Sequence, residues 1–111
     1  MYRYPIHEGK TQSDLVKQLK AEQFIRSLCV EEVMTTINRK FFAPGPYPYS
    51  DCPHPIGYGA FIEKPSTHAS ILEILFTKLR TRKCRIMDIG TGSGYLALAM
   101  ILMVIICQNL E

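Results

Sequence analysis

The stretch Arg85-Ile-Met-Asp-Ile-Gly-Thr-Gly-Ser-Gly-Tyr95 decides the fold class of this chain. Its first half carries three apolar residues and predicts a short buried strand. Gly90, Gly92 and Gly94 then predict a tight turn, because glycine accepts positive φ and lets a ligand approach the backbone. The apolar segment that begins at Tyr95 predicts a helix. A strand, a glycine turn and a helix in this order favour an α/β fold that holds a nucleotide-like ligand at the helix N-terminus.

Asp88 distinguishes this turn from a phosphate-binding turn. The pyrophosphate fingerprint reads Gly-x-Gly-x-x-Gly, whereas here an acid precedes three alternating glycines. A carboxylate at this place would repel a phosphate and attract a cation, and S-adenosylmethionine carries both an ammonium and a sulfonium. The turn therefore resembles the first motif of class I S-adenosylmethionine-dependent methyltransferases. The alternative at this point is a glycine-rich turn of some other α/β protein.

Size and composition describe one small domain of 111 residues with 47% hydrophobic content and a net charge of +3. The basic residues between Lys78 and Arg85 are interpreted as a solvated helix end and connector, so no nucleic acid partner is expected. The four cysteines are widely spaced and show no Cys/His ligand spacing, so we expect no metal site. The sequence start lacks the apolar core of a signal peptide, and reduced thiols in a cytoplasmic protein are the simplest interpretation.

Three helices are expected before the glycine turn. Residues 1–12 are polar and expected to be disordered, and Ser13 is expected to cap the first helix. A second helix is expected over residues 31–38, and both helices are interpreted as packing elements. The third helix, over residues 67–79 with Ser66 as its cap, shows the clearest apolar stripe of 3.6-residue period.

A proline-rich segment separates the second and third helices. Between Ala43 and Gly59 five prolines exclude regular helix, and a loop of this length is usually functional or disordered. His54 is interpreted as a solvated loop histidine, and residues 57–62 predict a short extended segment. His68 lies in the first turn of the third helix, where the helix dipole favours a neutral imidazole. The alternative for His68 is a surface histidine.

Residues 95–107 are almost wholly apolar and carry no polar stripe. This run is shorter than the ~20 residues that span a bilayer, so we expect a buried helix and no membrane association.

Several motifs occur in the right order around the third expected helix. They are Asn38-Arg39 with Phe41-Phe42-Ala43, Pro55-Ile56-Gly57-Tyr58-Gly59-Ala60-Phe61-Ile62, His68-Ala69, and Asp88-Ile89-Gly90-Thr91-Gly92-Ser93-Gly94. From about Ser13 to Tyr95 the chain resembles the protein-L-isoaspartate O-methyltransferase family of S-adenosylmethionine-dependent repair enzymes.

The resemblance implies a fold, an activity and a site. The expected fold is α/β: an N-terminal helical cap, then the first strand and first helix of a Rossmann-like class I methyltransferase sheet. The expected activity transfers a methyl group from S-adenosylmethionine to the α-carboxylate of L-isoaspartyl residues in damaged proteins, and the family is expected to be monomeric. The cofactor-binding positions that the resemblance implies are Ala60, Phe61, Ile62, His68, Asp88, Gly90, Thr91, Gly92, Ser93 and Gly94.

Two departures from the family pattern qualify these expectations. Glu63 stands where the family carries a serine, and an ionised carboxylate cannot donate a hydrogen bond to the substrate carboxylate. In this fold an acid at the end of the second strand, about 20 residues past the glycine turn, holds the cofactor ribose. No second strand is recognisable in the sequence between the turn and Glu111. We therefore expect residues 13–99 to be the N-terminal part of a methyltransferase domain and residues 100–111 to be a divergent apolar tail.

An incomplete and inactive methyltransferase of low stability is the first hypothesis for these 111 residues. The alternative is a non-catalytic interaction protein whose exposed apolar face recruits a partner or a second copy. A nucleotide-dependent oxidoreductase is the third hypothesis, which the acid before the glycine turn disfavours.

Overall fold

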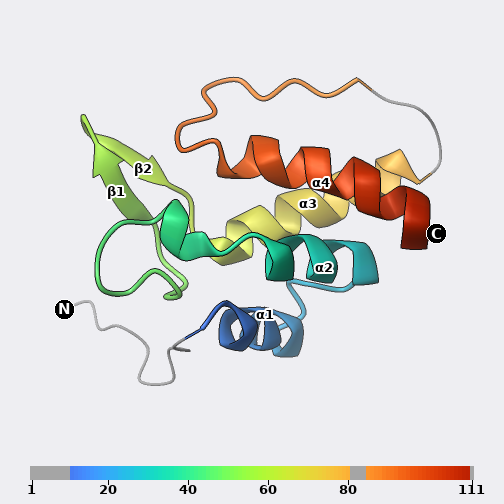
Figure 1. Ribbon diagram of the computed structural model, residues 1–111, viewed down its shortest axis with the longest axis horizontal. Coiled ribbons are helices and arrows are strands. Elements are labelled where there is room, and N and C mark those ends of the chain that lie inside the picture. The colour runs from blue at the N-terminus through green and yellow to red at the C-terminus, as the bar shows by residue number, and fades with distance from the viewer. Residues whose placement is uncertain (1–10, 81–84, 111) are drawn as a thin grey trace.

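The computed structural model describes residues 11–80 and 85–110 (Figure 1). The described residues form helices α1 (Gln12–Ala21), α2 (Leu28–Thr36), α3 (Pro65–Leu79) and α4 (Tyr95–Leu110), a short 3-10 helix η1 (Arg39–Phe41), and strands β1 (His54–Gly57) and β2 (Ala60–Ile62). Helix α2 packs against α1, α3 and α4, and the β1–β2 hairpin lies at one end of this helical layer (Figure 1).

The hydrophobic core lies between the helices. Each helix contributes side chains at the 3.6-residue spacing of one buried face. The least exposed of them are Leu15 and Leu19 of α1, Cys29, Val30, Val33 and Met34 of α2, Ala69 and Leu72 of α3, and Tyr95, Ala99 and Met103 of α4. Since a fully buried large apolar side chain stabilises a fold by roughly 1.5–3 kcal/mol, helix packing supplies most of the cohesion of this part of the chain.

Helices α1 and α2 begin earlier than the sequence suggested. Thr11, not Ser13, caps α1: its backbone is extended at φ −137° and its hydroxyl accepts a hydrogen bond from the Asp14 N–H at 3.1 Å. Ser27 caps α2 in the same way, so this helix starts three residues before the expected Glu31. It ends at Thr36 because the next residue is extended. Disorder was expected for residues 1–12, but Thr11 and Gln12 form the cap and the first residue of α1; residues 1–10 lie outside the described residues.

Helix α3 is capped by a distant residue. The expected cap, Ser66, lies inside the helix, where Lys64 occupies the cap position and Pro65 the first helical position. Proline suits that place because its fixed φ is helical and it lacks an N–H that would need a partner. The Ser66 N–H donates to Asp51 Oδ1 at 2.8 Å, so the proline-rich segment holds the start of α3.

Residues 57–62, expected as one extended segment, form the last residue of the first strand, the turn and the second strand of a hairpin. Strands β1 and β2 are antiparallel, with His54 opposite Ile62 and Gly57 opposite Ala60. The two turn residues, Tyr58 and Gly59, have φ values of 53° and 74°.

The strand expected before the glycine turn is not formed. Residues 85–89 carry no strand hydrogen-bond pattern in the described chain, and the side chains of Ile86, Met87 and Ile89 are 37%, 81% and 84% exposed. A strand exists only through a ladder partner, and no described residue pairs with this segment. The β1–β2 hairpin is thus the sheet of the described α/β structure. The basic connector expected over residues 81–84 lies outside the described residues.

Helix α4 begins at Tyr95, as expected, but it is buried on one side only. Tyr95, Ala99 and Met103 face α2 and α3, whereas Leu98 and Ile101 on the other side are 38% and 59% exposed. Within the described ranges, no helix is both long enough and apolar enough to cross a membrane.

Candidate functional site

The glycine turn between the extended segment and α4 presents open backbone. Gly90, Gly92 and Gly94 have φ values of 70°, 59° and 84°, which favour glycine. A Cβ atom added at Gly90 or Gly94 would meet nothing within 4 Å, whereas one at Gly92 would lie 3.8 Å from Cδ1 of Ile56 in β1. The turn therefore needs glycine for its conformation, and its backbone is accessible to a ligand beside the hairpin.

The start of α4 is organised by the turn itself. The Gly94 N–H donates to the Thr91 carbonyl at 3.0 Å, and the Tyr95 N–H donates to Ser93 Oγ at 3.2 Å. These bonds place Ser93 and Thr91 at the helix N-terminus, with Thr91 exposed and Ser93 half-buried.

Asp88 fits a cationic ligand better than an anionic one. This residue is half-buried, and its Oδ2 atom is buried with no hydrogen-bond partner among the described residues. A carboxylate oxygen without a partner gains from a nearby positive charge and is destabilised by a negative one. The negative charge and acceptor oxygen of Asp88 therefore suit a positively charged ligand such as S-adenosylmethionine, which carries an ammonium and a sulfonium.

His68 is a buried, neutral histidine, so the surface-histidine alternative is wrong. It is 5% exposed, and its ring stacks on Tyr95 with centroids 4.6 Å apart and planes 15° apart. Phe42 contacts the same tyrosine edge-on at 5.4 Å. Burial, and to a smaller extent the charge of Arg39, lowers the pKa of His68 to about 4, against the opposing effect of Asp88. Its Nδ1 atom has no hydrogen-bond partner in the described chain.

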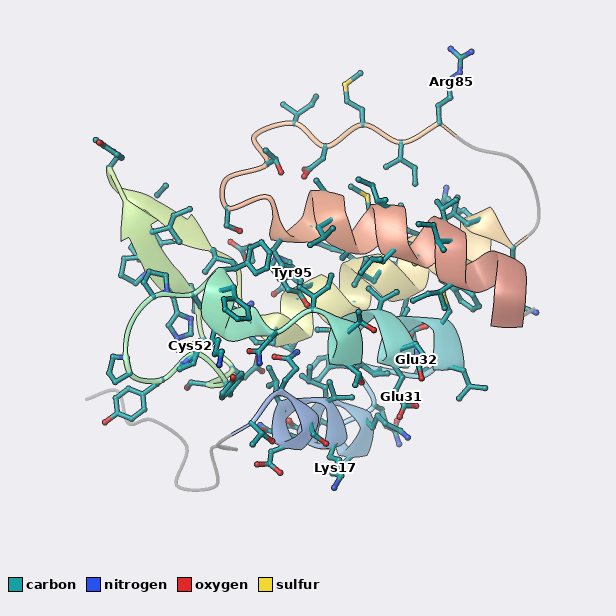
Figure 2. The ribbon with its side chains drawn as sticks, in the orientation of Figure 1. Lys17, Glu31, Glu32, Cys52, Arg85 and Tyr95 are labelled. Atoms are coloured by element: carbon teal, nitrogen blue, oxygen red, sulfur yellow. The ribbon has the colours of Figure 1, made fainter. Side chains whose placement is uncertain are left out.

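Figure 2 shows Tyr95 pointing from the start of α4 into the space between the helices, whereas Arg85 points away from them. Tyr95 is 1% exposed, and burial raises the pKa of its phenol to about 12. The buried ring therefore fixes the orientation of the His68 ring, which stacks on it.

Arg39 joins the segments around this site, although it is not among the site residues expected from the sequence. Its NH2 group donates to the Glu63 carbonyl at 2.6 Å and lies 3.5 Å from the Cys52 carbonyl. Arg39 is 1% exposed, and desolvation lowers its pKa to about 10, so it stays charged at neutral pH. Its Nε and NH1 atoms have no hydrogen-bond partner among the described residues. The available signal was its place in the Asn38-Arg39 motif, directly before Lys40 and the aromatic pair Phe41-Phe42.

The proline-rich loop is fixed by side-chain hydrogen bonds, and His54 is buried rather than solvated. His54 is 6% exposed; its Nε2 atom lies 2.7 Å from the Tyr47 carbonyl, and its Nδ1 atom lies 3.5 Å from Arg39 NH2. The Tyr49 hydroxyl donates to Asn38 Oδ1 at 2.7 Å. These hydrogen bonds hold the loop against η1, next to the hairpin.

The expected cofactor and substrate positions are only partly brought together. His68 and Asp88 interact electrostatically beside Tyr95, and Ile56 of the hairpin lies near the glycine turn, 3.8 Å from the place of a Cβ atom added at Gly92. Ala60 and Phe61 of β2 are exposed, and Ile62 is buried in the core, so only its backbone can face a ligand. The Glu63 side chain is exposed, and no described contact joins it to the glycine turn. In the part of the chain that the structure describes, no group of His, Cys, Asp and Glu side chains could hold a metal ion.

Comparison with known proteins links this geometry to one family. Residues 10–109 match the family model described as protein-L-isoaspartate(D-aspartate) O-methyltransferase. A protein-L-isoaspartate O-methyltransferase of Triticum aestivum is 45% identical over 91 residues, which are 81% of this chain and 39% of that protein. One of Caenorhabditis elegans is 36% identical over 96 residues, which are 86% of this chain and 42% of that protein. The chain thus spans about two fifths of the length of these curated relatives.

A solved structure shares the fold. A Plasmodium falciparum chain, provisionally described as a protein-L-isoaspartate O-methyltransferase and solved with S-adenosyl-L-homocysteine, aligns with a TM-score of 0.78 and 29% sequence identity. The alignment covers 91% of this chain and 45% of that one.

Proposed function

Because the chain belongs to the protein-L-isoaspartate O-methyltransferase family, we propose that it forms part of a site for S-adenosylmethionine-dependent methylation of L-isoaspartyl residues in damaged proteins. In this reaction an α-carboxylate oxygen bonds to the donor methyl carbon. The carbon–sulfur bond breaks and its electron pair returns to sulfur, which gives a methyl ester and S-adenosylhomocysteine. The observation that carries the proposal is the acid-led glycine turn, open at Gly90 and Gly94 and followed at once by α4.

The donor side of the proposed site combines one negative charge with a neutral ring. Asp88 faces the positive donor, and the backbone of Gly90, Thr91, Gly92, Ser93 and Gly94 lies along it. His68 adds no positive charge beside the sulfonium, because its low pKa keeps it neutral at physiological pH. Such a site needs no protein acid or base, since the acceptor carboxylate is already ionised and the sulfonium is a good leaving group. We attribute catalysis mainly to alignment of donor and acceptor.

The acceptor side is proposed to lie along Ala60, Phe61, Ile62 and Glu63. An ionised Glu63 at ~4 Å from a substrate carboxylate would cost roughly 1–4 kcal/mol at water-like to surface-like dielectric. We propose that its side chain stays in solvent and that its backbone shapes the site. The hydrogen bond from Arg39 to the Glu63 carbonyl supports separate roles for the backbone and the side chain of Glu63, because it fixes the peptide group independently of the side chain.

A segment exchange tests the proposal. Residues 10–109 of this chain replace the matching segment of the wheat relative, and transfer of labelled methyl groups is measured on an isoaspartyl peptide and on its ordinary aspartyl counterpart. We expect the chimaera to methylate only the isoaspartyl peptide. We expect the isolated 111-residue polypeptide to bind S-adenosylmethionine weakly, because it spans about two fifths of the relatives. A folded chimaera that binds no donor would contradict the proposal.

A non-catalytic interaction protein is the second candidate, and the outer face of α4 favours it. Leu98, Ile101, Val104 and Ile105 form this exposed face, and all four are apolar. An exposed apolar face of this kind can recruit a second copy of the chain. Light scattering should then show self-association that Ile101→Glu abolishes. Ile74→Glu, at an equally exposed position on α3, is the matched control and should leave it unchanged.

We propose the cytoplasm as the place of action and isoaspartyl proteins or peptides as the partners. Cys29 and Cys52 are buried cysteines that form no disulfide among the described residues, which suits a reducing compartment.

A further inference from the structure

The turn of the β1–β2 hairpin carries an aromatic side chain in an unfavourable backbone conformation. Tyr58 has φ 53° and lies between Gly57 at 102° and Gly59 at 74°. Positive φ at both central residues of a two-residue turn is typical of type I′ turns, which favour Asn-Gly. A bulky residue with positive φ is strained relative to asparagine or glycine.

Nothing within the described structure compensates for this strain. Tyr58 is 110% exposed, that is, at least as accessible as in an extended peptide, so its ring contributes no packing. Phe61, in strand β2 of the same hairpin, is 60% exposed. Figure 1 shows the turn projecting from one end of the molecule, away from the four helices. A strained aromatic residue without internal contacts points to a contact outside the chain.

The position of the hairpin indicates which partner this is. Ile56, two residues before Tyr58, lies near Gly92 of the glycine turn, with its Cδ1 atom 3.8 Å from the place that a Cβ atom added at Gly92 would take. Strand β2 leads directly into Glu63, whose carbonyl Arg39 fixes. The hairpin therefore borders the proposed site on its acceptor side, where a polypeptide carrying the reacting residue has to lie.

We propose that Tyr58, together with the exposed Phe61 of the same hairpin, is a docking surface for the polypeptide residues that flank the isoaspartyl residue, and that it favours apolar or aromatic neighbours there. This inference rests on the proposed function for the identity of the reacting residue. Tyrosine suits the role because it offers a large apolar ring with few rotatable bonds, which explains its enrichment at binding surfaces.

The test uses the 111-residue chain and four hexapeptides. Two contain an L-isoaspartyl residue, flanked by phenylalanine in one and by glycine in the other, and two are the corresponding aspartyl peptides. The variant Tyr58→Asn removes the ring and relieves the turn, whereas Tyr58→Phe keeps the ring. Gln23→Asn is the matched control, because Gln23 is an exposed non-glycine residue with a similar φ of 67° after α1, in a separate segment of the chain.

Two readouts are expected to move in opposite directions. Tyr58→Asn should raise the melting midpoint by about 2–6 °C, and Gln23→Asn should raise it comparably. Tyr58→Asn should also weaken binding of the phenylalanine-flanked isoaspartyl peptide by about 5- to 20-fold, with at most a twofold effect on the glycine-flanked one. Tyr58→Phe and Gln23→Asn should bind the peptides as the unmodified chain does.

The outcomes separate this inference from the proposed function. Isoaspartyl-selective binding that Tyr58→Asn leaves unchanged would overturn the docking surface and leave the proposed function standing. Binding that depends on Tyr58 but does not distinguish isoaspartyl from aspartyl peptides would support the docking surface and count against the proposed function. An unchanged or lowered melting midpoint in Tyr58→Asn would overturn the inference, and so would failure of every peptide to bind at millimolar concentration.

Discussion

Acidification should destabilise the folded chain through His68. Burial beside Arg39 lowers the pKa of this imidazole from 6.5 to about 4. Between these two values the unfolded chain binds a proton that the folded chain does not. The stabilising contribution of His68 is therefore full above pH 6.5 and is lost as the pH falls towards 4. The neighbouring charged and titratable groups that set this behaviour are Arg39 and Asp88, together with the stacked ring of Tyr95.

The magnitude follows from the two pKa values. Their difference corresponds to about 3 kcal/mol of unfolding free energy, of which about 2 kcal/mol is lost by pH 5. His68 is 5% exposed, so solvent does little to screen this effect. In a domain of this size such a loss is a large fraction of the total stability.

Urea unfolding from pH 7 to pH 4.5 measures the effect, with His68→Gln as the reference. Glutamine is polar and never charged, so the difference between the two curves isolates His68 from the carboxylates that titrate in the same range. The unmodified chain should lose about 2 kcal/mol more than the variant between pH 7 and pH 5. Proton NMR of the His68 ring should give a midpoint near 4 in the folded chain. Parallel unfolding curves, or a ring titration near 6.5 in the folded state, would refute the argument.

Three substitutions test other parts of the structure. Glu73→Gln should lower the unfolding free energy in urea titrations by about 1–2 kcal/mol, because the buried carboxylate accepts three hydrogen bonds at the start of α2. The control Glu31→Gln, which breaks a surface ion pair, should change it by at most about 0.5 kcal/mol. Asp51→Ala should cost about 1 kcal/mol through loss of the α3 cap, and Asp51→Asn, which keeps an acceptor, about half as much by the same measurement. Gly92→Val in the wheat chimaera should abolish donor binding in calorimetry, since Gly92 has φ 59° and Ile56 lies close to it, whereas Gly45→Val, also at positive φ, should only destabilise the fold.

The sequence alone determined the elements whose cause is local. The apolar stripe from Ile71 to Leu79 predicted α3, because 3.6-residue spacing is a property of neighbouring residues along the chain. The three alternating glycines predicted a turn with positive φ ahead of α4 for the same reason. The motifs around them also led to the family, which the match over residues 10–109 confirmed.

Only the tertiary structure decided the features that depend on distant partners. Asp51 caps helix α3, and Glu73 accepts hydrogen bonds at the start of α2. Each of these acids is more than a dozen residues away in sequence from the helix start that it supports, so no local pattern reveals it. Burial likewise made His54 an interior group instead of the expected solvated one, and it excluded the surface alternative for His68. The buried Arg39 links the proline-rich loop to Glu63, the residue after β2. The apolar pattern of residues 85–89 predicted a strand, but a strand forms only where another one pairs with it, and among the described residues none does.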